Sequence, residues 1–235
     1  MKTLAKYLPA AALGALLLIG GTSKASAATI YSQTFTGGTG ALAGTAPTVG
    51  TGTWTPDIPI SSVIDLNGNT TAQYGSISLA FTPTSGFVYD LTATINVTAA
   101  NGSWLGVGFL QANDAYGFFG TKTTPAALNR GGDWQTWAGP GANYGKTSND
   151  VLIRLDTTGA QWTSSVYQGG AQMGSTYTYT SGNPTINWVG FITEGAAVGS
   201  VSAFQLTQAV PEPSTYALVV GGLATLLLIR RRVQA

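Results

Sequence analysis

Few side chains in this 235-residue sequence could carry out chemistry, because it contains no histidine and no cysteine. The usual general base at neutral pH, the Ser-His and Cys-His nucleophile pairs, disulfides and thiolate metal sites are therefore excluded. Carboxylates remain, but Glu194 is the single glutamate between Ala28 and Val210, and no predicted strand there carries carboxylates at alternate positions. Glycoside hydrolysis needs two carboxyl groups that flank one bond. The sequence therefore predicts a protein that is not an enzyme.

Aromatic side chains between residues 116 and 144 are the best candidates for a ligand surface. Sugar rings present apolar C–H faces that can lie on Trp and Tyr, while amides and carboxylates bind the hydroxyl groups. If the rings form such a platform, at least two should be exposed on one face; otherwise they belong to the core. The candidate glycan-binding residues are Trp134, Trp137, Tyr144, Asp133, Gln135 and Asn143.

Calcium is the metal ion for which the sequence offers ligands. Asn113 with Asp114, and Asn149 with Asp150, supply oxygen atoms of the kind that Ca²⁺ prefers. Asn and Asp in turns more often bond the backbone of the turn itself. We therefore predict no metal site and no cofactor.

Short alternating segments separated by glycine, asparagine and proline must position these side chains, and no segment between residues 28 and 210 keeps a helical period. About ten strands with one polar face each require two sheets packed face to face. The sequence thus predicts one all-β domain over residues 28–209. The clearest predicted strands cover residues 30–35, 76–81, 89–98, 104–110, 151–156, 162–168, 175–180, 186–193 and 201–207.

Two stretches, 42–54 and 78–109, together with the closing segments 187–191 and 201–207, carry a family resemblance. They are similar to the concanavalin A-like (laminin G-like) jelly-roll domains of bacterial surface proteins. The resemblance implies a jelly-roll β-sandwich and, less directly, a carbohydrate ligand. Glycosidases of this fold carry Glu-x-Asp-x-x-Glu on one strand, and this sequence lacks that arrangement.

The N-terminus has the anatomy of a secretory signal peptide. Lys2 and Lys6 precede the uncharged segment 8–21, and Ala25 and Ala27 supply the small-x-small cleavage pattern. We predict a signal helix within residues 1–27 and cleavage after Ala27.

Three features follow one another at the C-terminus, in residues 210–235. A Pro-Glu-Pro segment comes first, then the uncharged segment 216–229, then an arginine triplet. As a helix the apolar segment would span about 21 Å, which is short for a transmembrane helix, and the arginines predict a cytoplasmic C-terminus. The residues of the predicted signal are Pro211, Glu212, Pro213, Arg230, Arg231 and Arg232.

This order of features resembles the PEP-CTERM sorting signal of bacterial exported proteins, also named the ice-binding protein C-terminal domain. The resemblance implies recognition by an exosortase, which processes the tail during delivery to the cell surface. A plain C-terminal membrane anchor is the alternative.

The net charge of the predicted domain and the two predicted targeting segments restrict the classes of function that the sequence allows. Between residues 28 and 210, four basic and eight acidic residues give a net charge of −4, which argues against nucleic acid as a partner. The sequence predicts an exported protein, held in the membrane by its C-terminal helix and then delivered to the cell surface or extracellular matrix. Two roles stay open: binding of a glycan such as exopolysaccharide, or a purely structural role without a small ligand.

Overall fold

One compact unit covers Ala27–Pro211 in the computed structural model. The predicted signal peptide and C-terminal sorting signal lie outside the described residues, except for Ala27 and Val210. Within the described ranges the chain forms strands and turns only, and it holds no helix able to cross a membrane. The structure describes residues 27–210 apart from 36, 58–62, 72–73, 99–102, 114–122, 138–141 and 196–197.

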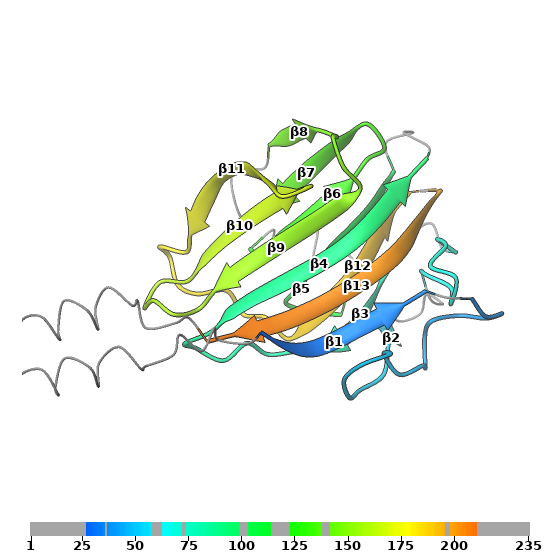
Figure 1. Cartoon of the computed structure of the whole chain (residues 1–235), viewed down its shortest axis with the longest axis horizontal. Helices are drawn as coiled ribbons and strands as arrows, with labels where there is room; N and C mark the ends of the chain where they lie inside the picture. Colours follow the sequence, from blue (N-terminus) through cyan, green and yellow to red (C-terminus); the bar gives the residue numbers. More distant parts are fainter. Residues whose placement is uncertain are drawn as a thin grey trace, which may run out of the picture. The chain divides into compact units, whose positions relative to one another are not determined.

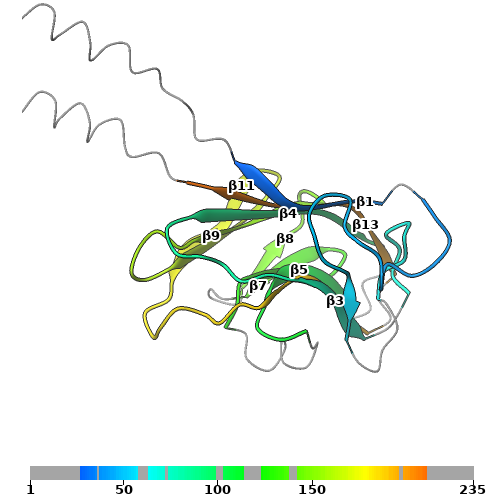
Figure 2. The same ribbon diagram turned by 90° about the horizontal axis from the view of Figure 1, so that it is seen from below.

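The strands form two sheets that lie as stacked layers (Figures 1 and 2). In order of neighbours, the six-stranded sheet contains β1 (Ala28–Thr34), β13 (Gly199–Ala209), β4 (Val88–Val97), β9 (Asp150–Asp156), β10 (Thr163–Gln168) and β11 (Ala171–Thr178). The seven-stranded sheet contains β2 (Thr55–Pro56), β3 (Gly75–Ala80), β12 (Trp188–Glu194), β5 (Trp104–Leu110), β6 (Ala126–Asn129), β7 (Asp133–Trp137) and β8 (Asn143–Gly145).

Every neighbouring pair of strands is antiparallel, so the predicted all-β sandwich is confirmed. Alternation in β4 places Leu91 and Ile95 in the core, fully buried, while Thr92 and Thr94 stay half-buried on the outer face. The partners of β4 in the sheet are β13 and β9, which lie far from it in sequence.

Three strands, β6, β7 and β8, lie in the stretch where the sequence predicted only a loose aromatic segment. They are short, and turns separate them. Asn129 explains part of their stability, because its buried amide donates to the carbonyl oxygen of Ile95 at 2.8 Å. That bond ties β6 of one sheet to β4 of the other and satisfies a buried polar group.

Trp54 lies at the centre of the core between the two sheets and is fully buried. Its ring stacks on Phe191 of β12 at 5.8 Å and meets Phe204 of β13 edge-on at 5.2 Å. The indole Nε1 donates to Oε1 of Gln33 at 3.1 Å, so its polar atom is satisfied inside the core. One tryptophan from the connection before β2 therefore packs against both sheets.

Candidate functional site

The predicted aromatic platform does not form, because its two tryptophans are buried. Trp134 is 0% exposed and Trp137 is 3% exposed. They stand three positions apart on β7, and side chains of a strand alternate between faces. Trp134 therefore enters the core, where its Nε1 donates to the carbonyl oxygen of Ser148 at 3.0 Å. The expectation that two of the predicted rings are exposed together is wrong for this pair.

Trp137 belongs instead to a small apolar cluster on the outer side of the seven-stranded sheet. It packs edge-on against Trp104 at 5.5 Å, next to the buried Leu128 and Ile192. The buried faces of these rings stabilise the sheet and are not available for stacking with a sugar.

The same outer side is covered over β3 by the segment that follows β5. Oδ1 of Asn113 accepts hydrogen bonds from the hydroxyls of Ser76 and Ser78, at 3.1 and 2.7 Å. Its Nδ2 donates to the carbonyl oxygens of Thr55 and Pro56, both at 3.1 Å. The amide of Asn113 is therefore fully used in holding this segment down.

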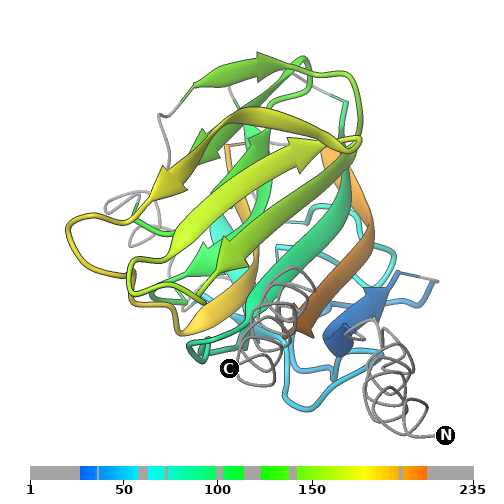
Figure 3. The same ribbon diagram turned by 60° about the vertical axis from the view of Figure 1, so that its left-hand side comes forward.

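The other predicted site residues lie near β7 and β8 without forming a ring platform. Tyr144 is half-buried, and its hydroxyl lies against Gly174 of β11, where an added Cβ would collide with it. Figure 3 shows these two edge strands, β8 in green and β11 in yellow, on the same side of the sandwich. Asn143 is exposed and faces Gln135 across the β7–β8 pair. Asp133 lies 3.9 Å from the guanidinium of its neighbour in the turn, Arg130.

The two predicted calcium sites differ in the surroundings of their asparagines, Asn113 and Asn149. Asn113 is occupied as described, and its predicted co-ligand Asp114 lies outside the described residues. Asp150 is exposed at the start of β9, and Oδ1 of Asn149 is buried without a hydrogen-bond partner. Among the residues that the structure describes, no three acidic side chains gather as a metal site would require.

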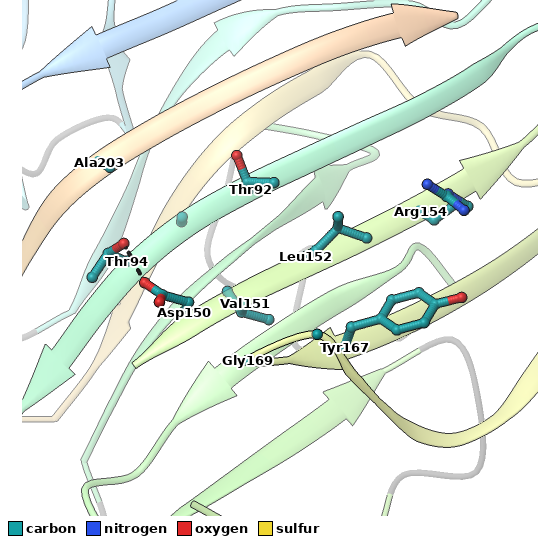
Figure 4. A pocket seen from close by; sticks show the side chains of 11 residues that line it. Thr92, Thr94, Asp150, Val151, Leu152, Arg154, Tyr167, Gly169 and Ala203 are labelled. Atoms are coloured by element: carbon teal, nitrogen blue, oxygen red, sulfur yellow. Dashed lines mark hydrogen bonds between the residues drawn. The ribbon is translucent and has the colours of Figure 1, made fainter. Parts of the chain in front are cut away.

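A trough of about 410 Å³ crosses the outer face of the six-stranded sheet over β4, β9 and β10 (Figure 4). Its volume falls within the range of small-ligand sites. The trough is lined by Thr92, Ala93, Thr94, Asp150, Val151, Leu152, Arg154, Tyr167, Gly169, Gly170 and Ala203.

Thr92, Leu152 and Tyr167 form the middle of the trough. They are direct neighbours on three strands, since Thr92 pairs with Leu152 and Leu152 pairs with Tyr167. With strands about 4.8 Å apart, the row spans about 10 Å. All three side chains are half-buried, so part of the tyrosine ring and of the leucine side chain stays accessible. The floor of the trough thus offers apolar surface to a ligand.

Hydrogen-bonded pairs of polar side chains lie at the two ends of the trough. At one end, Oγ1 of Thr94 donates to Oδ1 of Asp150 at 2.6 Å. At the other, Nε and one terminal nitrogen of Arg154 donate to the two carboxylate oxygens of Asp90, each at 2.7 Å. This bonding raises the pKa of the Arg154 guanidinium, which therefore stays charged. Because the pairs are already formed, little side-chain ordering is left for a ligand to impose.

Asp90 and Asp150 are spaced too widely to act as the two carboxyl groups of glycoside hydrolysis. Asp90 pairs with Arg154 and Thr94 pairs with Asp150, so the two carboxylates lie four strand positions apart. That separation is about 13 Å along the strands, whereas paired catalytic carboxyl groups lie about 5–9.5 Å apart. Asp90 is also engaged by Arg154. Asp90 and Asp150 are therefore not spaced as a catalytic pair.

Sequence reasoning missed the trough, although part of its signal was visible. The alternation in residues 89–98 placed Thr92 and Thr94 on a polar face, and that placement is confirmed. Their neighbours Leu152 and Tyr167 lie about 60 and 75 residues away in sequence. These residues come together only through the pairing of β4 with β9 and of β9 with β10, and a local sequence pattern does not reveal which strands pair.

No protein-family model matches the sequence, and no curated protein matches it. Solved structures do match. An endo-1,3-beta-glucanase from Streptomyces sioyaensis is 15% identical, with 79% of this chain and 97% of that chain covered and a TM-score of 0.52. The carbohydrate recognition domain of Emp47p is 13% identical, with 81% and 99% covered and a TM-score of 0.43. The CBM2 module of the evolved Dit of Lactobacillus casei BL23 phage J-1 is 12% identical, with 80% and 99% covered and a TM-score of 0.43. The first of these likenesses shows the fold, a jelly-roll β-sandwich of the concanavalin A-like class, as the sequence predicted.

Proposed function

We propose that this protein is a non-catalytic carbohydrate-binding protein whose ligand lies in the trough over β4, β9 and β10. The observation that carries the proposal is the accessible ring of Tyr167 between two preformed polar pairs. The likeness of fold to a glucanase adds support by analogy only.

The chemistry of the trough fits a sugar chain better than an apolar ligand. A sugar ring can place its C–H face on Tyr167 and Leu152 while its hydroxyls meet the Thr92 hydroxyl in the same row. Arg154 uses two of its five N–H donors on Asp90, and both oxygens of Asp150 can accept. The trough therefore offers donors and acceptors together, as hydroxyl groups require.

Replacing Tyr167 with alanine tests this proposal. An aromatic ring that stacks on a ligand contributes about 1–3 kcal/mol, by analogy with base stacking, so glycan retention should fall about tenfold. The unfolding midpoint should change little, because the ring is half-buried on the surface. Retention is measured by affinity electrophoresis on a panel of soluble glycans that includes the exopolysaccharide of the host.

Tyr177→Ala is the matched control. Tyr177 is 38% exposed on β11 and does not line the trough, so this variant should bind like the wild type. If wild-type protein retains no glycan of the panel, the structural role without a small ligand replaces glycan binding. Equal retention by the wild type and Tyr167→Ala would place the ligand elsewhere.

We also propose that the protein is exported by its signal peptide and processed at its C-terminal signal. The order of Pro-Glu-Pro, a short apolar segment and the arginine triplet supports this. The intact mass of protein extracted from the cell surface should lack residues 1–27 and the C-terminal arginines. Surface material that keeps Arg230, Arg231 and Arg232 would instead support a plain membrane anchor.

A further inference from the structure

A second hollow of about 360 Å³ lies beside the trough, at the end of β4 and the start of β9. The two hollows are neighbours in the chain, since Asn149 lines the second and Asp150 lines the first. The hydroxyl of Ser148, in the second hollow, accepts a hydrogen bond from the backbone N–H of Asp150 at 3.0 Å. Asn96, which lines the second hollow, lies two positions after Thr94 of the trough on the same strand β4, so the two hollows lie on the same face of the sheet.

Lys146 gives this second hollow its charge. Among the basic residues that the structure describes, Arg130 and Arg154 each have a carboxylate partner, and Lys146 has none within salt-bridge distance. Burial lowers the pKa of its ammonium group, which therefore has lost part of its contact with water. An anionic group would compensate for that loss through a charge-assisted hydrogen bond.

A buried acceptor in the same place also lacks a partner. Oδ1 of Asn149 is out of contact with solvent and accepts no hydrogen bond in the described structure. A buried polar atom of this kind costs about 1–3 kcal/mol, so Asn149 beside the hollow carries an uncompensated polar group. The turn at Gly131 and Gly132 forms the other wall of the hollow. No atom lies within 4 Å of the position that a Cβ atom would take at Gly132, so a substituent of the ligand has room there.

We propose that the second hollow binds the carboxylate of an acidic sugar, held by the ammonium group of Lys146, within the glycan that occupies the trough. The ligand class is then a polyuronate, a chain whose sugars carry both hydroxyls and carboxylates. This proposal rests on the proposed function and names the substituent that its site selects.

The test compares polyuronates with the same polymers after reduction of each carboxylate to a primary alcohol. Wild-type protein should retain the charged form about tenfold more strongly than the reduced form, and added salt should weaken that preference. Lys146→Gln should bind both forms alike, while Lys146→Arg, which keeps the charge, should keep the preference. Melting temperatures of both variants check that the fold persists.

The outcomes separate the two proposals. If wild-type protein binds both forms equally, or Lys146→Gln keeps the preference, the acidic subsite is overturned while the trough still stands. If binding of both forms depends on Tyr167 but not on Lys146, the ligand is a neutral glycan. If no polymer and no glycan of the wider panel is retained, both proposals fail.

Discussion

Replacing Trp134 with alanine is expected to destabilise the domain by about 3–5 kcal/mol, the cost of deleting a large aromatic side chain from a core. Trp134 is fully buried and packs in the main core. Its Nε1 also bonds the carbonyl oxygen of Ser148, which would lose its partner. A domain of this size has about 5–15 kcal/mol of stability in total, so the variant should unfold easily or fail to accumulate.

Chemical denaturation measures this effect through the midpoint and the free energy of unfolding. Tyr177→Ala serves as the control, since its ring is 38% exposed and its loss should cost under about 1 kcal/mol. If Trp134→Ala unfolds at the same denaturant concentration as the wild type, the indole is not part of the core. The predicted aromatic platform on β7 would then return as a candidate.

Replacing Gly190 with alanine is expected to disrupt the seven-stranded sheet at its interior strand β12. Gly190 lies opposite Ser78 of β3 and Gly108 of β5. A Cβ atom at Gly190 would collide with the carbonyl oxygen of Ile77 and lie 2.6 Å from the Cα of Ser78. Both contacts are with backbone atoms, which cannot move away by a change of rotamer as a side chain can. The cost should reach or exceed about 3 kcal/mol, the upper end for overpacked sites.

Gly145→Ala is the matched control for Gly190→Ala. Gly145 lies in β8 of the same sheet, and an added Cβ would meet no atom within 4 Å and no left-handed backbone. Its melting temperature should stay close to that of the wild type, whereas Gly190→Ala should lose soluble protein or melt far lower. Equal melting temperatures for the two variants would show that β12 and β3 are not packed as closely as described.

The strands that could be predicted from sequence are those with a regular alternation or a long apolar segment. Residues 104–110 were predicted as a strand with the bounds that the structure shows, and β4 differs from its prediction by one residue at each end. β7 was missed because Asp133 to Trp137 is only five residues long, lies in a glycine-rich stretch and breaks its alternation at Thr136. Short strands of that kind depend on their neighbours, here β6 and β8, for their hydrogen bonds.

The candidate site was harder to predict than the fold because a site depends on which face each side chain takes. Trp134 and Trp137 looked equivalent in sequence, yet they take opposite faces of β7: Trp134 enters the core between the sheets, and Trp137 is buried in the apolar cluster on the outer side. Tyr167 looked unremarkable in its strand and acquires its role through Leu152 and Thr92, contributed by two other strands. Composition suggested a glycan as the ligand, which stays a prediction, and the order of strands in the sheet determines which side chains form the proposed site.

The central claim is that a glycan occupies the outer face of the six-stranded sheet, and an NMR titration tests it most directly. With a retained glycan from the panel, backbone and side-chain resonances of Thr92, Leu152 and Tyr167 should shift together and saturate at one affinity. Resonances of Trp104 and Trp188, half-buried on the outer side of the other sheet, should stay unchanged. Shifts confined to those two tryptophans, with the trough unperturbed, would contradict the claim and move the site to the seven-stranded sheet.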